Sequence, residues 1–494
     1  MALPQSLYSV AQVRAFDAAV IRAPGMSTEL LMQRAGAAAL AVLRATWPGA
    51  SRVGILCGPG NNGGDGYVLG RLLRSLGVEV RLQAVAPAAS AAPAAQRAAQ
   101  EFLAAGGRID GFDGAALADC GLLVDALLGS GARSPVRGPY RAAIEAINAS
   151  GKPVLALDIP SGLDADTGQA ADLAVRATHT VCFVAAKAGL LLGEGPDYCG
   201  TLHCDDLQVA LPDAVPVATV LDDADLVAAL PPRPRSAHKG RNGHVLVIGG
   251  GPGMGGAARL CGEACLRAGA GLVTVAAHPD QLSFIIAGRP ELMGVAVRSA
   301  PDLNAILARS TVVAIGPGLG QDAWAAQLLS AALGSGRPLV IDADALNLLA
   351  GQGSQRLPAD AVITPHPGEA ARLLETSSAE VQQDRLVALG HLVTRLGCTV
   401  VLKGAGTLVG APGRVPALCT AGNPGMGTAG MGDVLTGAVA GVLAQCGDAW
   451  LAARAGVLAH ARAGDREAQR IGARGLLALD VAAQLPRALN RLAP

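Results

Sequence analysis

The stretch AGNPGMGTAGMGDVLTG, residues 421–437, places closely spaced glycines ahead of an apolar run, residues 434–443, that we predict to be a helix. Glycine lacks a Cβ, so the backbone can approach a ligand closely and adopt positive φ angles. The first N–H groups of a helix and the positive end of its dipole together favour a bound anion. Asp433 falls in the first turn, where a carboxylate can take a proton from a hydroxyl that attacks a phosphate.

The order of residues in this stretch narrows its interpretation. A glycine-rich turn is common, and Asp433 alone would serve as an ordinary residue at a helix start. The order G-x-G-D at a helix start, behind N-x-G-x-x-T, is much more specific. We therefore interpret the stretch as a phosphate site of a nucleotide.

Composition excludes several classes of protein. The 494 residues suffice for two or three domains, and a formal net charge of zero with 2% aromatic residues argues against nucleic-acid binding. The N-terminus has no signal-peptide pattern, and Gly and Pro interrupt the long uncharged runs, so we expect no membrane span. The ten cysteines form no C-x-x-C pair, which fits a reducing cytoplasm.

Apolar runs alternate with helical patterns along the whole chain. We predict helices within residues 9–47, a helix from Tyr67, and strands at 52–57, 78–85, 122–125, 153–158, 180–185, 244–248, 272–276, 312–315, 339–342, 362–363, 399–403 and 417–420. This alternation predicts an α/β fold with mostly parallel sheets covered on both faces. The pattern relaxes over residues 212–237, which we interpret as a linker between domains at 1–215 and 216–494.

Polar loops in the first half follow the carboxyl ends of predicted strands, where open α/β sheets bind ligands. Asn62, Asp125 and Ser161 would converge at adjacent strand ends, and one carboxylate with neutral oxygens suits a weakly charged cation. The alternative is ordinary turn chemistry. Asp158 is a candidate acid or base, and Lys187, one of four lysines in an arginine-rich chain, is its candidate partner.

These motifs resemble a known family. The sequences LMQRAG, NNGGDG, VDALLGSG and LDIPSGLDADTG are similar to the NAD(P)H-hydrate epimerases, which have a Rossmann-like three-layer fold. The resemblance implies epimerisation of hydrated NAD(P)H, with potassium held by Asn62, Asp125 and Ser161. It also implies that the substrate contacts Asn61, Asn62, Gly63, Gly64, Asp65, Gly129, Ser130, Gly131, Ala132, Arg133, Ser134, Pro135, Tyr140 and Asp158. Gln33 replaces the glutamate that the family usually has in LMERAG.

The second half carries a further set of strand-end motifs. GMGGAARL (253–260), GPGLG (316–320), DADALN (342–347), TPHPGE (364–369) and KGAGT (403–407) precede the opening stretch. Two prolines present His366 rigidly, and Lys403 at a strand end suits nucleotide phosphates.

In this order the motifs resemble the ADP-dependent NAD(P)H-hydrate dehydratases, which have a ribokinase-like α/β fold. The resemblance implies ADP as a co-substrate with Mg²⁺, bound by Lys403, Gly404, Ala405, Gly406, Thr407 and Gly432. Ala257, Gly318, His366 and Asp433 would face the hydrated substrate, with Asp433 as the catalytic base. Gly251 and Met254 replace a serine and an aromatic residue that are frequent in the family.

Together the two resemblances imply one cytoplasmic chain with both activities, and we expect a homo-oligomer. A small-molecule kinase is the main alternative, because ribokinase-like kinases use the same G-x-G-D motif to phosphorylate a hydroxymethyl group. The first half could instead be a non-catalytic ligand-binding or interaction module.

Overall fold

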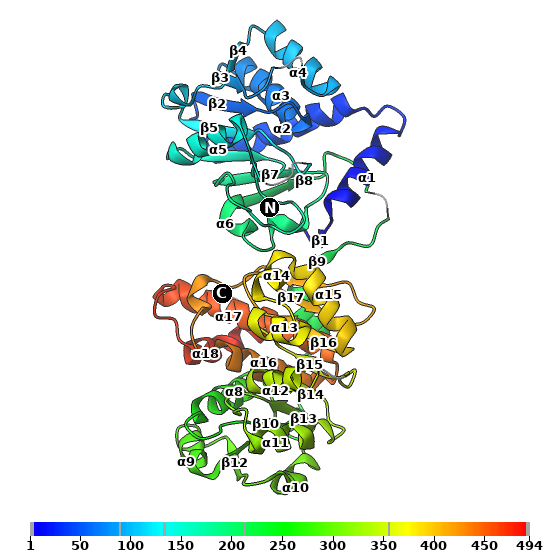
Figure 1. Ribbon diagram of the computed structural model, residues 1–494, viewed down its shortest axis with the longest axis vertical. Coiled ribbons are helices and arrows are strands. Elements are labelled where there is room, and N and C mark those ends of the chain that lie inside the picture. The colour runs from blue at the N-terminus through cyan, green and yellow to red at the C-terminus, as the bar shows by residue number, and fades with distance from the viewer. Residues whose placement is uncertain (1–3, 88–89, 132–134, 212, 354–355, 491–494) are drawn as a thin grey trace. The chain divides into compact units, whose positions relative to one another are not determined.

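The computed structural model describes residues 4–87, 90–131, 135–211, 213–353 and 356–490. The chain forms two compact units, Met1–Ala218 and Thr219–Pro494 (Figure 1). The segment interpreted as a linker is more ordered than we expected. It contains strand β9 (Ala218–Val220) and helix α7 (Asp223–Ala229), and Asp222 caps this helix through Ala224 N. Leu226 and Ala229 of α7 are buried in the core of the second unit, which explains why the segment is structured.

The first unit contains a parallel sheet with the strand order β4-β3-β2-β5-β6-β7-β8. Its strands are β2 (Arg52–Cys57), β3 (Glu79–Ala84), β4 (Ile109–Gly111), β5 (Leu122–Ala126), β6 (Val154–Leu157), β7 (His179–Phe183) and β8 (Thr201–Asp205). A short strand β1 (Ser6–Leu7) precedes them. The central strands are buried on both faces, as their continuous apolar runs predict. The edge strands β4 and β8 are short and polar, so the sequence pattern did not reveal them.

Helices cover both faces of this sheet (Figure 1). Helices α1 (Val10–Ile21), α2 (Thr28–Thr46), α3 (Asn61–Ser75) and α4 (Pro93–Ala104) pack against one face, and η2 (Gly114–Leu117) and α5 (Pro139–Ala149) against the other. Shorter elements are η3 (Ala188–Leu190) and α6 (Gly195–Cys199). Helix α3 begins at Asn61 rather than at Tyr67, so NNGGDG forms the first turns of a helix and not a loop.

The second unit contains a mixed sheet in which β9 is followed by β18-β17-β16-β15-β14-β13-β10-β11-β12. The bounds are β10 (His244–Ile248), β11 (Leu272–Ala277), β12 (Met293–Ala296), β13 (Val312–Ile315), β14 (Leu339–Ile341), β15 (Val362–Ile363), β16 (Thr399–Leu402), β17 (Thr407–Gly410) and β18 (Ala417–Cys419). Strand β17 pairs antiparallel with β16 and β18, and the other pairs are parallel. Consequently, residues 403–406 form the turn of a β-hairpin that the sequence pattern did not predict.

Helix α16 lies at the centre of the second unit's core. It shares this core with α7, α8, α17 and α18, and residues Val434–Leu443 are all buried. The helices that follow α7 in the chain are α8 (Gly255–Arg267), α9 (Pro279–Ala287), η4 (Ala300–Leu303), α10 (Asn304–Leu307), α11 (Ala323–Leu333), α12 (Ala343–Gly351), α13 (Pro367–Leu374), α14 (Ser378–Gln383), α15 (Arg385–Leu396), η5 (Pro424–Met426), α16 (Met431–Cys446), α17 (Ala449–Ile471) and α18 (Ala478–Leu489).

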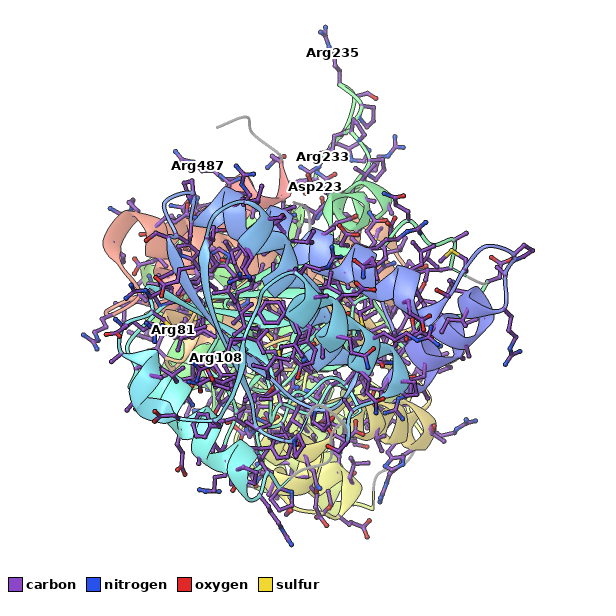
Figure 2. The ribbon with its side chains drawn as sticks, turned by 90° about the horizontal axis from the view of Figure 1, so that it is seen from above. Arg81, Arg108, Asp223, Arg233, Arg235 and Arg487 are labelled. Carbon is purple, nitrogen blue, oxygen red and sulfur yellow. The ribbon has the colours of Figure 1, made fainter. Side chains whose placement is uncertain are left out.

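The segment that follows α7 lies at the surface of the second unit. The irregular segment after α7 carries exposed arginines, and Figure 2 shows Arg235 projecting into solvent at its end. Arg233, nearer α7, donates to Gly269 O at 2.6 Å and so attaches the segment to the second unit. No helix among the described residues is long and apolar enough to span a membrane.

Candidate active sites

A cavity of about 580 Å³ lies at the carboxyl ends of the first unit's strands. Of the predicted substrate contacts, its wall contains Asn61, Asn62, Asp65, Gly129, Ser130, Gly131, Tyr140 and Asp158, together with Lys187. Gly63 and Gly64 are packed inside instead, because a Cβ on Gly63 would lie 1.9 Å from Gly58 O. Pro135 is exposed and outside the cavity wall, and Ala132, Arg133 and Ser134 lie outside the described residues.

Asp158 and Lys187 form a direct ion pair in this cavity. The Lys187 side chain is 2% exposed, and its Nζ also donates to Phe183 O at 3.1 Å. Burial is the largest effect and would lower the pKa of this ammonium, but Asp158, with smaller contributions from Cys182 and Asp17, raises the pKa overall. Asp158 has a φ of 64°, a strained conformation for a residue with a Cβ, of the kind that occurs at functional sites. The lysine is thus held charged and the carboxylate is held in place.

Asn62, Asp125 and Ser161 come together around the backbone of Leu128. Ser161 Oγ donates to Asp125 Oδ1 at 2.6 Å and accepts from Leu128 N at 2.9 Å. Asn62 Nδ2 donates to Leu128 O at 3.1 Å, which leaves the buried Asn62 Oδ1 without a hydrogen-bond partner among the described residues. Burial raises the pKa of Asp125 to about 6. An unpaired amide oxygen beside one carboxylate fits a monovalent cation.

In the second unit, the glycine-rich stretch places Asp433 in the first turn of α16. Gly430 caps the helix with a φ of 87°, and a Cβ there would lie 2.6 Å from Leu260. A Cβ on Gly432 would lie 3.3 Å from Lys403 Nζ, so glycine keeps this turn open toward the lysine. Burial, followed by the negative charge of Asp342, raises the pKa of Asp433 to about 7. A carboxylate with this pKa is suited to act as a base near neutral pH.

Lys403 is held by acidic side chains at neighbouring strand ends. Its Nζ lies 2.7 Å from Asp342 Oδ1 and 3.7 Å from Glu369 Oε2. Thr436 Oγ1 of α16 donates to the other oxygen of Asp342 at 2.8 Å. Burial alone would lower the pKa of Lys403, but Asp342 and Glu369 raise it. Lys403 therefore keeps its positive charge beside Asp433. Because Asp342 contacts both Lys403 and Thr436, the turn of the β16–β17 hairpin and the start of α16 are both attached to the end of β14.

The predicted substrate-facing residues of the second unit lie at three other strand ends. Gly318 has a φ of 57°, and a Cβ there would lie 3.1 Å from Ala257 Cβ, so these two loops are in close contact. His366 caps α13, and its Nδ1 accepts from Gly368 N at 3.0 Å and Glu369 N at 3.3 Å. These two hydrogen bonds fix the orientation of the imidazole ring. Its Nε2 lies 3.4 Å from Glu369 Oε1.

Sequence reasoning missed two side chains that hold the glycine-rich loops in place. Buried Arg385 on α15 donates to the backbone oxygens of Leu402, Lys403 and Gly406 at 3.2–3.3 Å, and burial lowers its pKa to about 10. Asp465 on α17 accepts from Gly422 N at 2.9 Å and from Asn423 Nδ2 at 3.0 Å. Neither has a local sequence signal, because each lies on a helix remote from the loop that it supports.

We expect Arg385→Met to weaken ADP binding. The substitution leaves buried backbone carbonyls without donors, at a cost of about 1–3 kcal/mol, so the KM for ADP should rise about tenfold. Steady-state dehydration kinetics measure this effect. Arg395→Met on the same helix removes a partly exposed ion pair with Glu375 and is the matched control. A KM for ADP within about twofold of the unmodified protein would contradict the bracing role.

Two units with polar sites at the ends of parallel strands define a bifunctional α/β enzyme. The family of NAD(P)H-hydrate dehydratases matches residues 245–487, and the family of YjeF-related protein N-termini matches residues 28–189. The bifunctional NAD(P)H-hydrate repair enzyme of Coxiella burnetii is 46% identical over 478 residues, covering 96% of this chain and 97% of that protein. Its Escherichia coli counterpart is 41% identical over 492 residues, covering 99% and 95%.

A solved structure agrees with these sequence matches. A ribokinase-like superfamily protein from Enterococcus faecalis is 32% identical, with a TM-score of 0.52, and covers 57% of this chain and 99% of its own. The predicted α/β class, with a Rossmann-like unit before a ribokinase-like unit, is confirmed. The chain belongs to the family of bifunctional NAD(P)H-hydrate repair enzymes.

Proposed function

We propose that the first unit epimerises the R and S forms of hydrated NAD(P)H and that the second dehydrates the S form with ADP. We assign the activities to residues 1–215 and 216–494. The observation that carries the second assignment is the position of Asp433, a base at a helix start beside a charged lysine. The first assignment is supported by the Asp158–Lys187 ion pair in a cavity of about 580 Å³ at the strand ends.

In the dehydratase site, Asp433 takes the proton of the hydroxyl at C6 of the hydrated ring. The resulting oxygen nucleophile attacks the terminal phosphorus of ADP, and AMP leaves. Backbone N–H groups of residues 430–432 stabilise charge on the transferred group. The ring nitrogen's lone pair then expels phosphate, and loss of a C5 proton gives NAD(P)H. The products are AMP, phosphate and the repaired cofactor.

The nucleotide would be bound by Lys403, Gly404, Ala405, Gly406, Thr407 and Gly432. We propose that Mg²⁺ accompanies the nucleotide and neutralises its phosphate oxygens. Mg²⁺ usually binds through phosphates and one or two carboxylates rather than in an all-protein cage. In the described chain, no cluster of three or more His, Cys, Asp or Glu residues could hold a metal, which fits this mode of binding. Ala257, Gly318 and His366 would orient the hydrated ring.

In the epimerase site, Lys187 holds Asp158 as a carboxylate that can accept a proton at the reacting carbon's oxygen. We propose that Asn62, Asp125 and Ser161 bind potassium. The unpaired oxygen of Asn62 and the buried carboxylate of Asp125 support this assignment. When bound, potassium supplies positive charge beside the dinucleotide. Tyr140 and the glycine loop at 129–131 would position the substrate.

We expect potassium to act on only one of the two steps. An R/S mixture of hydrated NADH is incubated with ADP, and the returning absorbance of the reduced ring is followed with potassium or with lithium. Recovery should be complete with potassium and should slow after the S fraction in lithium, because only epimerisation needs the ion. Pure S substrate is the control and should recover equally in both salts. Accumulation of a stable phosphorylated product would favour the kinase alternative.

We also propose a cytoplasmic homo-oligomer that acts on small molecules without nucleic acid or membrane. Each cysteine of the described chain is a free thiol, which supports a reducing compartment.

A further inference from the structure

Helix α1 contributes a carboxylate to the first unit's cavity that the steps above do not use. Asp17 lies in the wall of this cavity together with Asp158 and Lys187. Val13, Phe16 and Val20 are buried in the core and fix the orientation of the helix. Asp17 is half-buried and makes no hydrogen bond or ion pair with another described residue. An unpaired carboxyl in a substrate cavity is a candidate for proton transfer.

The surroundings of Asp17 and Asp158 differ. Among the described residues, the charged or titratable groups in the same cavity wall are Arg14 on α1, Asp65 on α3, Tyr140 on α5, Asp158 after β6 and Lys187 after β7. Burial raises the pKa of Asp17, and although Lys187 opposes this effect, the negative charge of Asp158 adds to it. Burial also raises the pKa of Asp65 well above its ordinary value. Lys187 forms its ion pair with Asp158 and not with Asp17, so the two carboxyl groups have different electrostatic surroundings.

We propose that Asp17 is a second catalytic residue of the epimerase site, where it donates a proton to the C6 hydroxyl of the hydrated ring. This inference rests on the function proposed for the first unit. An unpaired carboxyl and a lysine-paired carboxyl in the wall of one cavity can serve as proton donor and proton acceptor at one carbon. The two groups come from separate elements, a helix and a strand end, and so can serve different positions around the ring.

The proposed step is balanced in atoms and charge. The Asp17 proton passes to the C6 hydroxyl, the C6–O bond breaks with its electron pair leaving on water, and the ring nitrogen's lone pair forms a C6=N bond. A water molecule then adds to the opposite face of the planar carbon, and its proton passes to Asp158. The reverse turnover, or exchange with solvent, restores both carboxyl groups. The net result is inversion at C6.

The test is Asp17→Asn in the full-length protein, with purified R substrate and no ADP. The kcat for epimerisation should fall about 10²-fold or more, with KM within about twofold, because a proton donor is lost rather than a binding contact. In the unmodified enzyme, kcat should fall as the pH rises above the pKa of Asp17, since the donor loses its proton. The Asn variant should lack this alkaline decrease. Dehydration of S substrate should be unchanged.

Two variants separate the possible outcomes. Asp110→Asn on β4 removes a carboxylate outside the cavity wall and should leave both activities intact. Asp17→Glu should recover at least a tenth of the lost rate; no recovery at an unchanged melting temperature would overturn the proposal. Epimerisation by Asp17→Asn within about twofold of the unmodified enzyme would also overturn it. If the unmodified enzyme failed to epimerise, the proposed function of the first unit would be wrong instead.

Discussion

Asp433→Asn is expected to abolish dehydration while epimerisation continues at its normal rate. The asparagine preserves the size of the side chain but cannot accept the proton of the C6 hydroxyl. Loss of a positioned general base typically costs about 10²–10⁴-fold in rate. The decrease should appear in kcat, measured with S substrate and saturating ADP. The epimerisation rate reports on the first unit only, so an unchanged melting temperature of the second unit is the check that the variant is folded.

The pH dependence provides an independent check of the same role. Asp433 must be ionised to act as a base, and its pKa is raised to about 7 by burial. The dehydration rate of the unmodified enzyme should therefore increase with pH through about 7 and decrease in acid. Asp360→Asn, at an exposed position of the same unit, is the matched control and should keep the normal profile. Equal loss of both activities in Asp433→Asn would contradict the division of labour between the units.

Lys187→Met should have the second large effect, on epimerisation alone. The variant leaves Asp158 without its ammonium partner in a largely buried position. Removing one partner of a buried pair can destabilise a protein by about 3–5 kcal/mol, and Asp158 should then shift toward its protonated form. We expect an epimerisation rate reduced by about 10²–10⁴-fold. With an R/S mixture and ADP, only the S fraction should be repaired.

The control for this variant is Lys152→Met, since Lys152 belongs to the same unit but lies outside the cavity wall. It should retain both activities. A lowered melting temperature of the first unit with normal dehydration would agree with the buried-pair argument. Normal epimerisation by Lys187→Met would show that Asp158 does not need the lysine.

The motifs that could be predicted are those whose chemistry is local in sequence. Residues 421–437 contain the glycines, the helix start and Asp433 within one stretch, so the sequence alone predicted a helix start with an acidic first turn there. By contrast, Asp17 and Arg385 reach their sites only through tertiary packing. In a chain where arginine replaces most lysines, nothing distinguished Arg385 from a surface cation.

Two errors in the predicted elements also have physical causes. NNGGDG was expected to belong to the loop before a helix that starts at Tyr67, and glycine is indeed unfavourable in a helix interior. In the structure, a Cβ on Gly63 would lie 1.9 Å from the backbone oxygen of Gly58, so the close approach of this helix to the loop after β2 requires glycine. The supposed linker is structured because the proline-rich part begins only at Pro231, after α7 ends.

The acidic side chains around Lys403 affect which form of ADP the enzyme binds. Asp342 and Glu369 both contact this lysine, and Asp433 lies beside it. Three acidic groups therefore surround one cation at the proposed nucleotide site. A free diphosphate would meet electrostatic repulsion there despite the helix dipole. A nucleotide already complexed to a divalent ion carries less negative charge and is repelled less. The site around Lys403 is thus expected to bind metal-complexed nucleotide in preference to free nucleotide because of its net charge alone.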